Sequence, residues 1–116
     1  LHSFPTRRSS DLVGELREKA SVPALIEALE RFEYSPLLQG LPSLPERAIV
    51  YHHEPNRPQP RLDRALYGGM ASHAGRLRPC SIFDYRMVTL SHNTIKGAAG
   101  GSIVNAELLA RTKFGM

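Results

Sequence analysis

Apolar positions near the start of the chain repeat at the spacing of a helix face. They are Val22, Leu25, Ile26 and Leu29. Ser21 precedes them and can cap a helix with its hydroxyl, and Pro23 suits a first helical turn, where a missing N–H costs nothing. This pattern predicts an amphipathic helix over residues 22–33. The apolar face of this helix must pack against another element, and we expect that element to be a sheet.

Three later segments have the composition or alternation of strands. Residues 47–53 contain the β-branched and aromatic run Ile49-Val50-Tyr51, and residues 84–91 alternate between two sets of side chains. We expect a further strand over residues 70–77, joined to 84–91 by a turn near Pro79. Proline-rich stretches at 35–46 and 54–67 predict long loops between these elements.

Residues 94–111 predict a second helix, which Asn93 or Thr94 can cap. Its first turns consist almost entirely of small residues: Gly97, Ala98, Ala99, Gly100, Gly101 and Ser102. Each glycine weakens a helix by roughly 0.8–1 kcal/mol relative to alanine, so the pattern suits a place where a backbone or a ligand comes very close. Ligand contact at the helix N-terminus and tight helix–sheet packing both explain it. The spacing matches neither the P-loop nor the dinucleotide GxGxxG motif.

Residues 1–12 carry no helical or strand period and no apolar core of a secretory signal. Residues 4–12, Phe-Pro-Thr-Arg-Arg-Ser-Ser-Asp-Leu, match the conceptual translation of a common sequencing-adapter oligonucleotide. We therefore expect residues 1–12 to be a non-native adapter translation. Residues 13–116 are then expected to be the C-terminal piece of a longer protein.

Composition limits the class of protein. The 116 residues suffice for one ordinary domain, and 41% hydrophobic with 22% charged residues is a globular composition. No apolar run approaches the roughly 20 residues of a membrane span, so no membrane partner is expected. The net charge of +4 is spread among acidic residues, which favours a mixed solvated surface over nucleic-acid binding.

Several reactive side chains suggest sites, each with a simpler explanation. Cys80 could act as a nucleophile with His73 or His92 as its base, but it sits in a turn without a recognisable signature, which favours a packing or surface cysteine. His52 and His53 cannot readily share a metal ion, although Glu54 follows them, because consecutive strand residues point to opposite faces. No metal site is expected.

Three arginines, Arg57, Arg61 and Arg64, could bind phosphate or nucleic acid. No aromatic residues are interleaved with them, so carboxylate contacts at an interface explain them better.

A set of motifs resembles the aspartate-semialdehyde dehydrogenase family in order and spacing. The motifs are Leu41-Pro42-Ser43 with Pro45-Glu46-Arg47, Arg57-Pro58-Gln59-Pro60-Arg61-Leu62-Asp63-Arg64, Gly69-Met70, Gly75-Arg76-Leu77-Arg78, Asp84-Tyr85-Arg86 and Leu90-Ser91-His92-Asn93-Thr94-Ile95-Lys96-Gly97-Ala98-Ala99-Gly100-Gly101. The last is the most specific, and the resemblance covers essentially all of 13–116. The stretch 70–74, Met-Ala-Ser-His-Ala, departs from the more β-branched strand expected there.

The resemblance implies an α/β fold: the C-terminal catalytic and dimerisation domain of a semialdehyde dehydrogenase, with a mixed sheet, helices packed on one face, and no Rossmann domain in this fragment. It implies a cytoplasmic enzyme of two or four identical subunits that reduces L-aspartyl 4-phosphate to L-aspartate 4-semialdehyde with NADPH. That reaction lies on the route to lysine, threonine and methionine.

The resemblance also implies which site residues this chain carries. The family's cysteine nucleophile and histidine base belong to motifs N-terminal to residue 13, so no catalytic residue is expected here, and Cys80 does not stand in for the nucleophile. Asn93, Thr94 and Gly97 match positions near the nicotinamide end of NADP. An inactive fragment of the dehydrogenase is the first hypothesis. A stand-alone dimerisation or binding module, or a related acyl-CoA reductase, are the alternatives.

Overall fold

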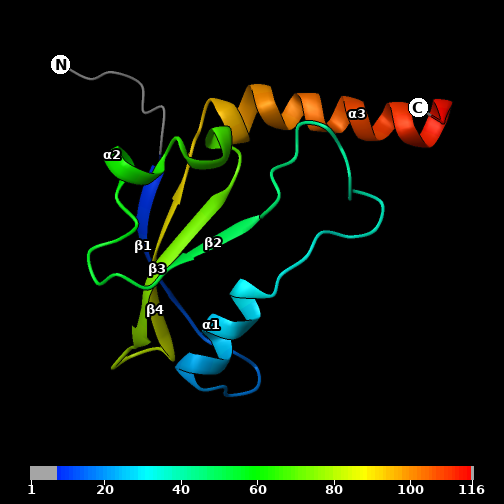
Figure 1. Ribbon diagram of the computed structural model, residues 1–116. Coiled ribbons are helices and arrows are strands. Elements are labelled where there is room, and N and C mark those ends of the chain that lie inside the picture. The colour runs from blue at the N-terminus through cyan, green and yellow to red at the C-terminus, as the bar shows by residue number, and fades with distance from the viewer. Residues whose placement is uncertain (1–7, 116) are drawn as a thin grey trace.

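A four-stranded mixed sheet forms the centre of the molecule (Figure 1). A computed structural model of the chain describes residues 8–115, with side chains from Leu12 onward. The strands are β1 (Arg8–Gly14), β2 (Ile49–His52), β3 (Ser72–Pro79) and β4 (Tyr85–Ser91), in the order β1-β4-β3-β2. β2 runs parallel to β3, and the other two pairings are antiparallel. The α/β class and the mixed sheet expected from the sequence are confirmed.

Helix α1 (Val22–Glu30) forms where the apolar spacing predicted it, but ends three residues earlier. The Ser21 hydroxyl accepts a hydrogen bond from the Ala24 amide at 3.2 Å, as expected for an N-cap. The helix lies over β2 and β3 on one face of the sheet, and an apolar groove of about 330 Å³ remains between α1, β1 and the sheet. Leu25, Leu29 and Met87 are among its lining residues.

The opposite face is covered by the segment that links β2 to β3. This segment contains the short helix α2 (Pro60–Asp63) and the 3-10 turn η1 (Leu66–Gly69). It crosses β3 so closely that a Cβ at Gly75 would overlap the carbonyl oxygen of Arg57. Helical structure therefore lies on both faces, because the residues of the predicted 54–67 loop fold back over the sheet.

The helix predicted over 94–111 has two parts. Residues Ile95–Ala99 form the π-helical turn η2, and Gly100–Phe114 form α3. In the π turn, amides bond carbonyls five residues back: Gly97 N–H to His92 O at 3.1 Å and Ala99 N–H to Thr94 O at 3.0 Å. α3 extends beyond the end of the sheet and runs beside the long loop that follows α1 (Figure 1). Arg111 donates to Gln39 O at 2.5 Å, which ties the two together.

Strand β1 begins within residues 1–12, where no strand was expected from the sequence. Its residues Arg8–Gly14 pair in antiparallel register with Tyr85–Ser91. The edge of β4 presents free backbone donors and acceptors that any extended segment can satisfy, so the pairing does not require a strand-like pattern of side chains. Because this pairing depends on the backbone alone, it does not indicate whether residues 1–12 are native. Residues 1–7 lie outside the described part of the chain.

The most deeply buried large side chains are one leucine and two polar groups. Leu90 is 1% exposed, His73 2% and Asp63 0%. Smaller apolar residues, Ala71 and Ala74 among them, complete the core. Within residues 8–115, no helix combines the length and apolar character that crossing a membrane requires. The polar groups at the centre are the first feature of the fold that needs explanation.

Candidate functional site

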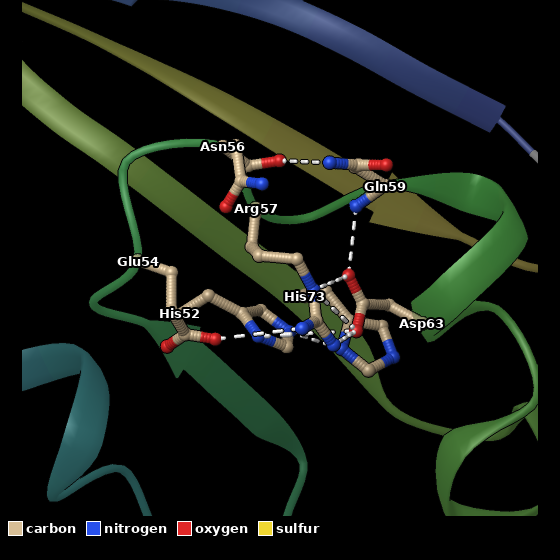
Figure 2. Close-up of polar contacts among 7 residues, drawn as sticks. All are labelled: His52, Glu54, Asn56, Arg57, Gln59, Asp63 and His73. Carbon is tan, nitrogen blue, oxygen red and sulfur yellow. Dashed lines mark hydrogen bonds and ion pairs between the residues drawn. The ribbon is translucent and has the colours of Figure 1, made fainter.

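A chain of buried polar contacts joins β2, β3 and the segment that crosses them (Figure 2). His52 and His73 lie on neighbouring parallel strands and face the crossing segment, and Nε2 of His52 lies 3.0 Å from Nδ1 of His73. Their rings are stacked, with centroids 5.2 Å apart. Nδ1 of His52 lies 4.0 Å from the Asp63 carboxylate. The contacts therefore continue from the sheet to α2.

Asp63 is held by two neighbours in its own segment. The guanidinium of Arg57 pairs with both carboxylate oxygens, with Nε 2.9 Å from Oδ2. The backbone N–H of Gln59 donates to Oδ2 at 2.7 Å. The Arg57 hydrogen bond, followed by the Gln59 amide and the nearby His52, holds the pKa of Asp63 at about 2 despite burial. Asp63 is therefore an anion near neutral pH, and its charge is compensated within the chain.

His73 occupies the far end of this polar chain. Burial, followed by the neighbouring His52, lowers the pKa of His73 to about 4. Its Nε2 atom is buried and has no hydrogen-bond partner among the described residues. His73 is therefore neutral near pH 7, with one ring nitrogen unsatisfied.

The residues expected to meet the cofactor lie at the start of η2. Thr94 occupies the N-cap position, but its side chain makes no capping hydrogen bond. The ring of His92 caps the turn instead: its Nδ1 accepts from the Ile95 amide at 3.2 Å and lies 3.1 Å from the Thr94 hydroxyl. The expected cap by Thr94 was thus wrong, because the ring of His92 accepts from the Ile95 amide in its place.

The glycines of this region have different roles. A Cβ at Gly101 would lie 2.7 Å from the Lys96 carbonyl, and one at Gly100 would lie 2.7 Å from the Ile95 carbonyl and overlap the Met70 sulfur. Both glycines therefore accommodate the backbone of the π turn, five residues earlier. A Cβ at Gly97 would meet only the His92 carbonyl at 3.8 Å, an ordinary contact. Nothing in the described chain requires glycine at 97.

Lys96 also belongs to this turn. Its ammonium donates to the Ser72 hydroxyl at 2.7 Å, and burial lowers its pKa. No carboxylate forms a salt bridge with Lys96 in the part of the chain that the structure describes. The lysine thus fixes η2 to the first residue of β3 and adds a positive charge near His73.

The other sequence candidates are not brought together. His73 lies near the start of β3 and Cys80 follows its end, so the six strand residues 74–79, which span roughly 20 Å, separate them. His92 follows β4 at the same end of the sheet as His73, also far from Cys80. His52 is buried and His53 exposed, as their alternation predicted. Within the described residues, no three potential ligands are grouped as a metal ion would need.

Among the three arginines, only Arg57 forms a strong carboxylate contact, and its partner is Asp63 of the same chain. The expected carboxylate contact is therefore present for Arg57, but within the chain. Arg61 and Arg64 are exposed. Sequence reasoning missed the His52–His73 contact and the role of Asp63 altogether. The available signal was a pair of histidines, one in each of two predicted strands, beside an Arg-x5-Asp spacing.

Comparisons with known proteins point consistently to one enzyme. No family model matches the chain. Aspartate-semialdehyde dehydrogenase from Methanothermobacter thermautotrophicus is 46% identical over 97 residues, 82% of this chain and 28% of that protein. The enzyme of the same name from Cryptococcus neoformans is 51% identical over 69 residues, 60% of this chain and 19% of that protein.

A solved structure agrees with these sequence relatives. The crystal structure of aspartate semialdehyde dehydrogenase with NADP from Candida albicans matches with a TM-score of 0.70 and 42% identity, over 81% of this chain and 26% of that one. The chain spans about a quarter of the length of these relatives. Since sequence and fold agree over most of its residues, the chain carries a segment homologous to part of the aspartate-semialdehyde dehydrogenases.

Proposed function

We propose that the chain is part of an NADP-dependent aspartate-semialdehyde dehydrogenase, which reduces L-aspartyl 4-phosphate to L-aspartate 4-semialdehyde in amino-acid biosynthesis. The 46% identity to the Methanothermobacter enzyme over 82% of this chain carries the proposal. The match to a related enzyme crystallised with NADP supports the choice of cofactor. By itself the segment is inactive, because the family's nucleophile and base belong to motifs that it does not contain.

In this proposal the start of η2 contacts the nicotinamide end of the cofactor. Thr94 and Gly97 are exposed and Asn93 is partly exposed, and the space over Gly97 is open. Such a surface fits one end of an extended ligand without enclosing it. The Asn93 amide would hydrogen-bond the carboxamide of the cofactor, and Gly97 would let the ring approach the backbone. When bound, NADPH would supply a hydride to the acyl carbon, and these residues would orient its donor ring.

The π turn makes this contact surface rigid. His92 caps its first amide, and Lys96 ties it to Ser72 at the start of β3. A fixed turn lowers the entropy that is lost when a ligand is oriented. The proposal also includes an assembly of two or four copies of the complete enzyme, located in the cytoplasm.

A chimera tests the proposal. The matched stretch of the Methanothermobacter enzyme is replaced by that of this chain, and NADPH-dependent reduction of aspartyl phosphate is measured. We expect turnover within about tenfold of the parent enzyme, because a functionally equivalent segment retains the orienting contacts. A folded chimera that binds NADPH but does not turn over would contradict the proposal. It would favour a binding module built on the same fold.

A further inference from the structure

The buried pair of histidines has no part in the proposed cofactor contact, yet it joins three separate elements. His52 lies on the edge strand β2, His73 on the inner strand β3, and Asp63 on α2. We propose that the His52–His73 pair is an acid-sensitive latch, which holds β2 and the Arg57–Asp63 segment on the sheet while the His73 ring is neutral, and releases them when His73 takes up a proton.

The direction of the hydrogen bond follows from the charge on Asp63. Its carboxylate lies 4.0 Å from Nδ1 of His52, which favours the tautomer that carries its proton on this nitrogen. Nε2 of His52 then accepts from the Nδ1–H of His73, across 3.0 Å. This leaves Nε2 of His73 as the free lone pair, and it is the buried atom without a partner in the described chain.

That free lone pair is where a proton would add, and its surroundings oppose the resulting charge. His73 is 2% exposed, so an imidazolium there would have almost no contact with water. Lys96 on η2 and Arg57 of the crossing segment both disfavour a positive charge on His73, and Asp63 favours it. Asp63 is already engaged by Arg57 and by the Gln59 amide, and Glu54 is paired with Arg57.

The β4 residue opposite His73 is Leu90, which is apolar and 1% exposed, so it cannot stabilise the charge. A proton is therefore accommodated when the ring reaches water, and this requires the crossing segment to lift. β2 contributes only four residues, at the edge of the sheet. We expect it to separate together with the crossing segment.

The test follows hydrogen exchange and unfolding of the 116-residue chain from pH 7 to pH 4.5. After correction for the change in intrinsic exchange rates, the opening constant of the β2 amides should rise about 50-fold. This is the factor expected if the pKa of His73 is about 6.5 in the open state and about 4 in the closed state. The β1–β4 amides should stay protected. Parallel loss of protection at β1–β4 would indicate global unfolding and overturn the latch.

Variants separate the pair from other acid effects. The double variant His52→Leu/His73→Val replaces both partners by apolar groups, so that neither is left with an unpaired polar atom, and the pH dependence of β2 opening should disappear. His53→Gln is the matched control, because His53 is adjacent but exposed, and it should retain the 50-fold effect.

Nitrogen-15 spectra of the imidazoles in the unsubstituted chain provide a readout that does not depend on how the variants fold. We expect one neutral ring with its proton on Nδ1 donating to the other ring, and no protonation of His73 in the closed state above about pH 5. Protonation of His73 between pH 6 and 7 without any opening of β2 would overturn the proposal.

Discussion

The guanidinium of Arg57 and the carboxylate of Asp63 form a two-point ion pair across α2, and the two partners differ in exposure. The Asp63 side chain is 0% exposed, whereas that of Arg57 is 26% exposed. The pair, together with the Gln59 amide, fastens the crossing segment above β3. Loss of either partner leaves an unpaired charge, and the defect is more severe when Arg57 is lost, because the Asp63 carboxylate is then buried without its cation.

Asp63→Asn should destabilise the chain by about 3 kcal/mol, because it leaves the guanidinium without its anion and removes one of the acceptors that the segment is built around. Chemical denaturation measured at pH 7 gives the difference in the free energy of unfolding. Arg61→Ala is the matched control, since Arg61 is exposed on the same short helix, and it should change stability by less than about 0.5 kcal/mol. Equal effects of the two changes would contradict the structural role of Asp63.

The same pair predicts a window of acid sensitivity below that of the histidines. Asp63 has a lowered pKa of about 2, against 3.8 for an unperturbed carboxyl, so the unfolded chain takes up its proton first as pH falls. The stability contributed by the carboxylate is complete above about pH 4 and is lost as pH falls toward 2. This contribution to the free energy of unfolding is about 2 kcal/mol. Urea titrations at pH 4.5, 3 and 2 should show the loss in the unsubstituted chain and a much smaller one in Asp63→Asn.

Local patterns predicted the elements of this fold better than they predicted its polar interior. Helix α1 followed from the Ser21 cap and the apolar spacing, which are properties of neighbouring residues. The π turn could not be read from Gly100 and Gly101, because these glycines are explained by carbonyls five residues earlier, a geometry that a 3.6-residue period does not contain. The approach of His52 to His73 depends on strand register, and sequence reasoning did not assign it.

Two glycine substitutions separate backbone crowding from open surface. In Gly100→Ala, the new Cβ would lie 2.7 Å from the Ile95 carbonyl and overlap the Met70 sulfur, so we expect a loss of about 1–3 kcal/mol despite the better helix propensity of alanine. Gly97→Ala meets nothing closer than 3.8 Å and should be neutral or stabilising by up to about 1 kcal/mol. Thermal unfolding of both variants checks the order. A Gly100→Ala chain as stable as Gly97→Ala would show that the turn relaxes freely.

The isolated chain should self-associate through α3. Ile103, Leu109 and Phe114 are each more than half exposed on this helix, and α3 has no fully buried residue. Large apolar side chains that remain exposed on a helix promote association. Light scattering after size-exclusion chromatography should show a mass that rises with concentration, and Leu109→Lys combined with Phe114→Lys should lower it. A monodisperse monomer at all concentrations would show that these side chains do not form a cohesive patch.

Asn93 and His92 can be distinguished in the chimeric enzyme, because one is proposed to contact the cofactor and the other caps the turn. Asn93→Asp removes the amide donor and places an anion beside the cofactor, so NADPH affinity should fall by about 1–3 kcal/mol while unfolding is little changed. His92→Ala removes the acceptor of the Ile95 amide, so stability should fall by about 1 kcal/mol. Fluorescence titration with NADPH and thermal unfolding of the same samples measure both quantities. An unchanged dissociation constant in Asn93→Asp would remove Asn93 from the cofactor site, whatever the effect of His92→Ala on stability.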